Sequence, residues 1–321
     1  MRTFVFTLFL LVSLTPFIKA GEFDNVDKYA RSIHKTSDYK TLTKKLVASF
    51  KTDKEKARAI YVWITDNIRY DWNKFIKGNN KRQRIQGRSK KEIQLKKQKL
   101  KEKKINKVYS SGKGVCEDYS MLFEAMCRIA GVKSAYIRGY TRTNSNSMRF
   151  PTNSKHAWNA IQLGGKWYLI DATWGAGYVT NGRFHKKFED GFFMTKPEIF
   201  ILSHFPKEQK WQLLEHPISK QMFPKNPYLH SGFYEFDIVD FTPKYGFLSA
   251  KNKFSIVKLK FKNKAPNVYQ YKNGKLKPIE STKNGNEIEL KIPTLAEYNR
   301  NIKLVVKKGK KAIPLITYKI K

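Results

Sequence analysis

Cysteine is scarce in this sequence of 321 residues, which contains only Cys116 and Cys127. Two cysteines cannot staple an exported protein of this size in the way that several disulfides do. If one helix carries both, their eleven-residue separation corresponds to roughly 16 Å, far beyond the reach of a disulfide bond. Each thiol therefore needs its own explanation, and we expect Cys127 to be a buried apolar residue.

Acidic residues are also few, since 26 Asp and Glu oppose 64 Lys and Arg and leave a net charge of +38. Calcium sites need clustered carboxylates, which the sequence lacks, so a calcium-dependent mechanism is disfavoured and we expect no metal or other cofactor. The positive charge favours anionic partners such as acidic glycans, cell-wall polymers, lipid head groups or nucleic acid. No known nucleic-acid-binding motif is present, so a specific nucleic-acid partner is not expected.

A long apolar run occurs only near the N-terminus. Residues 4–14 are apolar apart from one Thr and one Ser, Arg2 precedes them, and Ile18-Lys19-Ala20 resembles a cleavage site. This layout is typical of a secretory signal peptide, and the run is short for a membrane span. We expect residues 1–20 to be cleaved, the mature protein to be secreted or periplasmic, and no segment to span a membrane. An uncleaved N-terminal anchor is the alternative.

Apolar residues make up 40% of the sequence, which is enough to build packed cores. The length of the chain suggests two domains. We place the first at residues 21–224. Within it, residues 52–55 match a capping box, and helical spacing of the apolar residues that follow predicts an amphipathic helix. Those residues are Ala57, Ile60, Tyr61, Ile64 and Ile68.

Residues 77–107 differ from their surroundings, because they contain fourteen Lys and Arg against Glu92 and Glu102 alone. Few of them are apolar, so we expect a solvated basic insertion that is partly helical and mobile. The alternative is an electrostatic tether to an anionic surface.

The segment 225–321 changes character again. Short runs of alternating apolar and polar residues recur in it, separated by turn signals such as Asn273-Gly274 and Asn284-Gly285. Alternation with a period of two and regularly spaced turns predict a small β-sandwich as the second domain.

Cys116 lies where the break at residues 111–114 gives way to a helical pattern. The unpaired amides and the dipole of a helix N-terminus favour an anion, so we expect them to stabilise a thiolate at Cys116. A thiolate is the reactive form of a cysteine nucleophile.

A nucleophilic cysteine needs a base, and His156 is the histidine that begins a strand leading directly into a hairpin. If Gly164 and Gly165 are the two turn residues, opposing positions sum to 329. His156 then lies diagonal to Asp171 on the same face of the hairpin, within reach of its side chain. Asp171 would orient the imidazole and stabilise its cation. Each of the three residues alone is more often structural, and their order and register together favour a triad.

Three blocks of the sequence carry a specific resemblance: Gly114-Val115-Cys116-Glu117-Asp118-Tyr119, His156-Ala157-Trp158-Asn159, and Trp167 to Gly175. They resemble the transglutaminase-like superfamily, which carries Cys, His and Asp in this order on a papain-like α+β core. Phe200 to Pro206 and Trp211 to Leu214 resemble its kyphoscoliosis-peptidase branch. The resemblance covers roughly residues 55–235.

The resemblance implies a fold and a set of roles. The fold is α+β, a papain-like transglutaminase core followed by the C-terminal β-sandwich. Cys116 becomes the nucleophile, His156 the general base and acid, and Asp171 the orienting carboxylate. The backbone amide of Cys116 would form part of an oxyanion hole, with Trp72 as a candidate second donor.

Three further residues have open roles at this stage. Trp158 and Trp174 are expected to line the substrate cleft or to pack in the core. Asp118, where the family often has a smaller residue, would place a negative charge near the thiolate. We expect Asp118 to be solvated, so that its repulsion is screened.

The function that follows is acyl transfer at amide bonds of proteins or peptides through a thioester on Cys116. If water resolves the thioester, the enzyme is a peptidase or deamidase, and if an amine does, it is a transglutaminase. Hydrolysis is favoured by the peptidase-branch resemblance. The alternative is a non-catalytic module of the same fold that binds anionic cell-wall or surface polymers.

Overall fold

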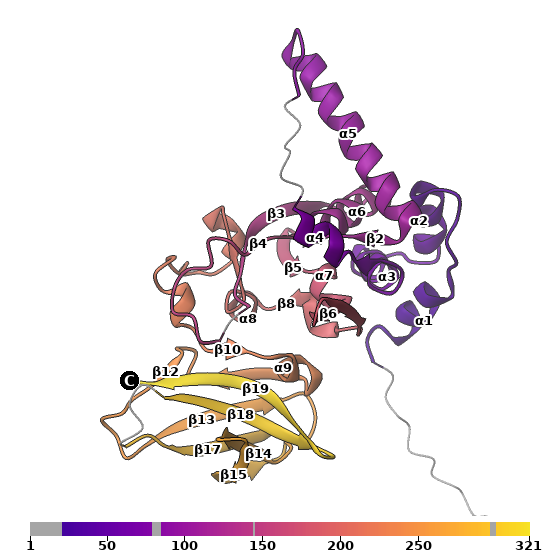
Figure 1. Ribbon diagram of the computed structural model, residues 1–321. Helices are drawn as coiled ribbons and strands as arrows, with labels where there is room; N and C mark the ends of the chain where they lie inside the picture. The colour runs from indigo at the N-terminus through magenta and orange to yellow at the C-terminus, as the bar shows by residue number, and fades with distance from the viewer. Residues whose placement is uncertain (1–20, 79–84, 144, 296–299) are drawn as a thin grey trace, which may run out of the picture.

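The computed structural model describes residues 21–78, 85–143, 145–295 and 300–321. The predicted signal peptide, residues 1–20, lies outside this part of the chain. Within it, no helix has both the length and the apolar content needed to cross a bilayer. The N-terminal half is built on helices, shown in indigo and magenta in Figure 1: α1 Asp24–Ser32, α2 Tyr39–Val47, α3 Asp53–Asn67, α4 Trp72–Lys77, α5 Lys90–Ser111 and α6 Cys116–Ile129.

Helix α3 is the centre of the helical layer. It begins with the predicted capping box between Thr52 and Glu55, and all five apolar positions predicted for its buried face are buried. The expected amphipathic pattern is incomplete, because every residue from Ala57 to Thr65 is buried. Arg58 is buried with its charge compensated, since it donates to Asp27 at 2.7 Å and also pairs with Asp190.

A five-stranded antiparallel sheet in the order β8-β5-β4-β3-β9 lies against helix α6. Its strands are β3 Ser134–Thr141, β4 Lys155–Leu163, β5 Lys166–Ile170, β8 Phe193–Thr195 and β9 His204–Pro206. The β4–β5 hairpin has the predicted register, because Asn159 pairs with Ile170 and Leu163 with Lys166. Gly164 and Gly165 both have positive φ angles, which a two-residue turn of this twist requires and which glycine adopts without strain.

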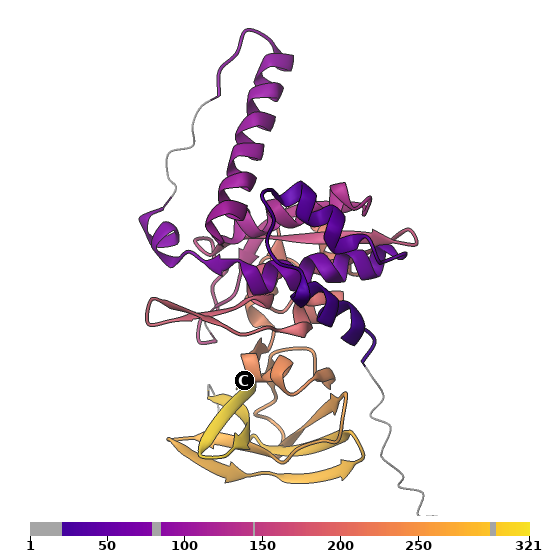
Figure 2. The same cartoon turned by 90° about the vertical axis from the view of Figure 1, so that its right-hand side faces the viewer.

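The basic insertion is partly helical, as predicted, and most of it is the long helix α5, which projects from the body of the molecule in both views (Figures 1 and 2). Its last turns are only partly solvated, because one face of them is buried. Ile105, Val108 and Tyr109 are buried in the helical core, and Glu102 accepts a hydrogen bond from Tyr39 at 2.8 Å. One face of α5 after about Glu102 therefore belongs to the core, whereas Lys103, Lys104 and Lys107 are exposed.

The C-terminal part forms the predicted two-sheet arrangement, drawn in orange and yellow in Figure 1. One sheet has the order β10-β19-β18-β14-β15 with β12 beside β19, and the other has the order β11-β13-β17-β16. Inward residues of both sheets share one core. The strands are β10 Tyr228–Leu229, β11 Ile238–Thr242, β12 Phe247–Leu248, β13 Phe254–Phe261, β14 Val268–Lys272, β15 Lys275–Pro278, β16 Glu280–Asn284, β17 Glu287–Pro293, β18 Asn301–Lys308 and β19 Lys311–Ile320.

The two parts are joined by apolar packing as well as by the chain. Phe205 of strand β9, and Ile201 shortly before that strand, lie in the same buried cluster as the sandwich residues. Helix α9 (Ser231–Glu235) presents Tyr234 to Phe192, with ring centroids 4.5 Å apart. The sandwich therefore supports the region around β9 and residues 190–192.

Because only the C-terminal end of α5 is buried, truncation of an aliphatic side chain there should destabilise the fold more than truncation of an exposed one on the same helix. Ile105→Ala should lower the free energy of unfolding by about 2–4 kcal/mol, because Ile105 is 1% exposed and a cavity would remain. Leu95→Ala, at a position 48% exposed, is the matched control and should change it by no more than about 0.5 kcal/mol. Urea denaturation measures both; equal effects would contradict this assignment of the core.

Candidate active site

Cys116 is the first residue of helix α6, as the sequence predicts. Strands β1 (Arg69–Tyr70) and β2 (Lys113–Gly114) pair in parallel, with Tyr70 opposite Gly114. The amide of Asp71 donates to the Gly114 carbonyl at 2.9 Å, and the two segments then turn into helices α4 and α6. The segments that lead into Trp72 and Cys116 thus lie side by side, and the oxyanion-hole role of both residues stays a prediction.

The two thiols have different surroundings. Cys116 is 7% exposed, whereas Cys127 is fully buried, as predicted. Burial raises the pKa of the Cys127 thiol, which keeps this residue in the neutral form. Neither forms a disulfide. Cys116 is therefore the thiol available for chemistry.

Asp118 corrects the sequence-based expectation of a solvated carboxylate. It is only 3% exposed, its Oδ2 atom accepts a hydrogen bond from the Val115 amide at 2.8 Å, and Lys74 Nζ lies 2.5 Å from the same oxygen. The carboxylate caps the first turn of α6, which buries it, and the Lys74 ammonium compensates its charge. Repulsion of the thiolate is thus reduced by a paired cation and not by solvent.

His156 and Asp171 are brought together by the β4–β5 hairpin. His156 Nε2 lies 2.6 Å from Asp171 Oδ2, and both residues are buried. Asp171 Oδ1 accepts hydrogen bonds from the amides of Thr173 at 2.8 Å and Trp174 at 3.1 Å. Asp171 is therefore the N-cap of the short helix α7 (Ala172–Gly175). The predicted contact is confirmed, because a two-residue turn places positions 156 and 171 on one face of the hairpin.

The hairpin is in turn tied to the helix that carries the thiol. Asn159 Nδ2, on β4, donates to the carbonyl oxygen of Ser120 on α6 at 3.1 Å. Tyr119 of α6 donates to the Ile68 carbonyl at 2.7 Å. These contacts hold α6 in place relative to both β4 and the segment that leads into Trp72.

The electrostatics of the pair follow from burial and mutual contact. Burial by itself would lower the pKa of His156, but the carboxylate of Asp171, together with Cys116, raises it to about 10. Burial would raise the pKa of Asp171, but its contacts with His156 and His204 outweigh burial and hold that pKa below its ordinary value. At neutral pH the pair is therefore an imidazolium facing a carboxylate.

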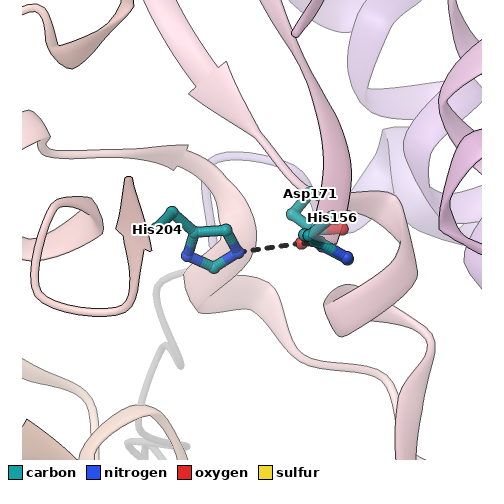
Figure 3. A group of neighbouring side chains, drawn as sticks. All are labelled: His156, Asp171 and His204. Carbon is teal, nitrogen blue, oxygen red and sulfur yellow. Dashed lines mark hydrogen bonds and ion pairs between the residues drawn. The ribbon is translucent and has the colours of Figure 1, made fainter. Parts of the chain in front are cut away.

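A second histidine, His204 of strand β9, contacts the same carboxylate, as Figure 3 shows. Its Nε2 atom lies 3.0 Å from Asp171 Oδ2, and its Nδ1 atom lies 2.7 Å from Ser203 Oγ. The sequence gives six histidines, and no role for His204 was predicted. A signal was present in the sequence, because a histidine in the apolar run from Phe200 to Phe205 has to be buried and needs polar partners.

Aromatic rings enclose the three polar residues. Trp158 is fully buried, and its ring stacks on His156 at 6.0 Å. Trp174 is half-buried and lies 5.9 Å from the ring of His156 and 4.5 Å from that of His204. Trp158 is thus a core residue, whereas Trp174 covers the His–Asp contact at the boundary with solvent.

The ligand atoms of His156, Asp171 and His204 lie within 4.8 Å of one another, a spacing that a metal site could also have. Metal–ligand bonds of about 2.0–2.2 Å hold ligand atoms roughly 3 Å apart or more. The 2.6 Å separation between His156 Nε2 and Asp171 Oδ2 is instead that of a charge-assisted hydrogen bond. The geometry fits a hydrogen-bonded network better than it fits a metal centre.

Comparison with known proteins agrees with this arrangement. Residues 40–172 match the family model of the transglutaminase-like superfamily. This range contains Cys116, His156 and Asp171. The chain thus carries a transglutaminase-like domain with the mixed helix-and-strand architecture of papain-like cysteine enzymes, and a buried His–Asp pair lies within it.

Curated proteins with similar sequences include kyphoscoliosis peptidases. The protein of that name from Homo sapiens is 31% identical over 288 residues, which is 88% of this chain and 40% of that protein. Hillarin from Drosophila melanogaster is 27% identical over 239 residues, 68% of this chain and 26% of that protein. The chain thus spans well under half the length of these relatives. A solved structure of a TGase, 15% identical, covers 54% of this chain and 37% of its own, and its TM-score of 0.29 supports no further conclusion.

The opposite pKa shifts of the two residues predict how stability depends on pH. Because the pKa of His156 is raised in the folded protein, its contact with Asp171 stabilises the fold fully below pH 6.5. This contribution is lost as the pH rises towards about 10. Because the pKa of Asp171 is lowered in the folded protein, its ionised carboxylate stabilises the fold above pH 3.8. This stabilisation is lost as the pH falls below that value. The stability advantage of the wild type over His156→Gln should therefore be largest between about pH 4 and 6.5.

Denaturant unfolding across this pH range measures the effect. His185→Gln, on the exposed hairpin between β6 (Gly177–Thr180) and β7 (Arg183–Lys186), is the control and should show no such profile. A difference between wild type and His156→Gln that is constant with pH would show that the pair is not ionised in the folded protein.

Proposed function

We propose that this chain is an exported thiol enzyme that acts on amide bonds of proteins or peptides through a thioester on Cys116. The observation that carries the proposal is the buried contact of 2.6 Å between His156 and Asp171 in a domain whose helix α6 begins at Cys116. A buried ion pair of this kind is costly to maintain for stability alone, so a chemical role explains it better. The catalytic domain would be residues 21–224 and the supporting sandwich residues 225–321.

The chemistry assigns one role to each residue. The thiolate of Cys116 attacks the amide carbonyl carbon, and the C–N bond breaks after an oxyanion intermediate that the Cys116 amide stabilises. His156, as the imidazolium, gives its proton to the leaving amine. Asp171 accepts a hydrogen bond from His156 Nε2, which leaves Nδ1 to face the thiol and the substrate. A water molecule, whose proton His156 takes, then attacks the thioester carbon, the C–S bond breaks, and Cys116 leaves as the thiolate.

An amine in place of water would give transglutamination through the same thioester. We favour hydrolysis, because the relatives at about 30% identity are kyphoscoliosis peptidases. A binding module without catalysis is the alternative, and it predicts an unreactive thiol. Labelling with a thiol-directed electrophile separates the two, since an inert Cys116 would favour the binding module.

Substitution of the triad tests the proposal directly. Cys116→Ala and His156→Ala should each abolish turnover, whereas Asp171→Asn should leave a reduced rate, and the losses should not be additive. Cys127→Ala is the matched control, because this second thiol lies on the same helix but is fully buried. Mass spectrometry of protein substrates incubated with enzyme and a small amine distinguishes cleavage, deamidation and amine adducts. Wild-type turnover by Cys116→Ala would refute the assignment.

The basic helix supports a second proposal, that an anionic polymer or surface binds the chain beside the active domain. Helix α5 projects from the body (Figure 2) and exposes many lysines along its length. The exposed lysines are Lys90, Lys91, Lys96, Lys97, Lys99, Lys103, Lys104 and Lys107. A projecting array of like charges attracts polyanions more strongly than the same charges spread over a globule.

Charge removal tests this proposal. A triple variant of Lys97, Lys103 and Lys104 to Gln should weaken binding to an anionic polymer such as heparin, most clearly at low salt, where screening is least. The control is Lys307, Lys310 and Lys311 to Gln at the exposed β18–β19 turn, which removes the same charge elsewhere. Equal weakening by both variants would show that net charge matters and the helix does not.

A further inference from the structure

We propose that His204 is a positioning residue of the catalytic group: as the neutral Nε2–H tautomer it donates a hydrogen bond to Asp171 and holds this carboxylate for His156. The inference rests on the proposed function, because it assigns a purpose within the same reaction. It extends the Cys–His–Asp arrangement to a chain of five groups, Cys116, His156, Asp171, His204 and Ser203.

The sheet explains how a residue more than thirty positions away reaches Asp171. Strand β3 lies between β4 and β9, and Gly139 of β3 is opposite both His156 and Pro206. His204 is two residues from Pro206, so it shares the face on which His156 lies. A Cβ atom at Gly139 would lie 2.3 Å from the Trp158 ring, so glycine leaves room for this indole beneath both histidines.

The hydrogen bonds determine the tautomer of His204. Asp171 Oδ2 can only accept, so the His204 nitrogen 3.0 Å away must carry a proton. A neutral imidazole then has an acceptor at Nδ1, and Ser203 Oγ, 2.7 Å from it, is the donor. The Phe200 carbonyl is 3.4 Å from the same hydroxyl, a weaker alternative. The Phe200 carbonyl also interacts with His204 and raises its pKa, and the shorter contact with Ser203 favours the tautomer that serves Asp171.

Burial and charge explain why His204 is neutral. It is fully buried, and burial lowers its pKa to about 4 in spite of Asp171. The titratable groups that face it are Asp171 and His156, while Tyr234 of α9 faces Ser203. The carboxylate thus has one cationic partner, His156, and gains from His204 a donor that brings no competing charge.

The contact completes the hydrogen bonding of a carboxylate that water cannot reach. Asp171 is fully buried and has four donors: two backbone amides at Oδ1 and two imidazoles at Oδ2. Phe200 stacks on His204 at 4.0 Å and Trp174 lies at 4.5 Å, so no solvent replaces the donor if it is removed. Loss of a donor raises the pKa of a buried carboxylate and frees it to rotate.

The first experiment compares two replacements of His204. His204→Leu removes the donor, and we expect kcat/KM to fall about 10- to 100-fold, as for the loss of a hydrogen bond to a charged group. The acid limb of the kcat/KM profile should move to higher pH, because Asp171 would protonate at a higher pH without this donor. His204→Gln carries an N–H near the position of Nε2 and should restore the rate and the acid limb to near wild type. His185→Leu, on the exposed β6–β7 hairpin, is the control.

A purely structural role would lower the melting temperature of both variants and leave the acid limb in place, and this result would overturn the proposal. A second measurement avoids substitution of His204 altogether. Imidazole ¹⁵N shifts of His204, recorded in the Cys116→Ala protein, should show the neutral Nε2–H tautomer from pH 5 to 9. A titration near 6.5 or an Nδ1–H tautomer would refute the inference. Because this protein lacks the nucleophile, the result does not depend on the proposed activity.

Discussion

The buried carboxylate of Asp171 is the constraint on which the rest of the site depends. An ionised carboxylate without partners in a fully buried position would be very costly, so donors must surround it wherever the chain folds. Four donors do, and they come from α7, β4 and β9. These segments are far apart in the sequence, and none can be displaced without leaving part of the charge unsatisfied.

The need to hold these donors around Asp171 also constrains residues that do not contact the carboxylate. Strand β9 must lie next to β3 for His204 to reach Asp171. Phe205 of β9, and Ile201 shortly before it, pack in the core of the β-sandwich. There is no space for a side chain at Gly175, the last residue of α7, because a Cβ atom there would lie 2.0 Å from the hydroxyl of Tyr61. Tyr61 in turn donates to the Glu189 carbonyl at 2.6 Å. The sandwich and the central helix thus both support the geometry of one carboxylate.

Several features followed from local rules. The capping box at Thr52 and the glycine pair at Gly164 and Gly165 act over a few residues, so their sequence was sufficient to predict the start of α3 and the hairpin register. The register in turn predicted the contact between His156 and Asp171. Asn273 and Gly274, both with positive φ, join β14 and β15 in the same way. Alternating apolar residues predicted strands such as β13, because one face of each is buried.

Other features depended on which distant segments meet. The order of Cys116, His156 and Asp171, the helical start at Cys116 and the hairpin are properties of the sequence itself. The burial of Asp118, the docking of Ile105 and the second imidazole on Asp171 are not, and two of these three contradicted composition-based expectations. A charged residue or a Lys-rich segment is solvated unless another part of the chain supplies a partner. Only the tertiary structure brought Lys74 to Asp118, Ile105 into the helical core and His204 to Asp171, because hydrogen bonds and apolar contacts between distant segments form only once those segments have packed together.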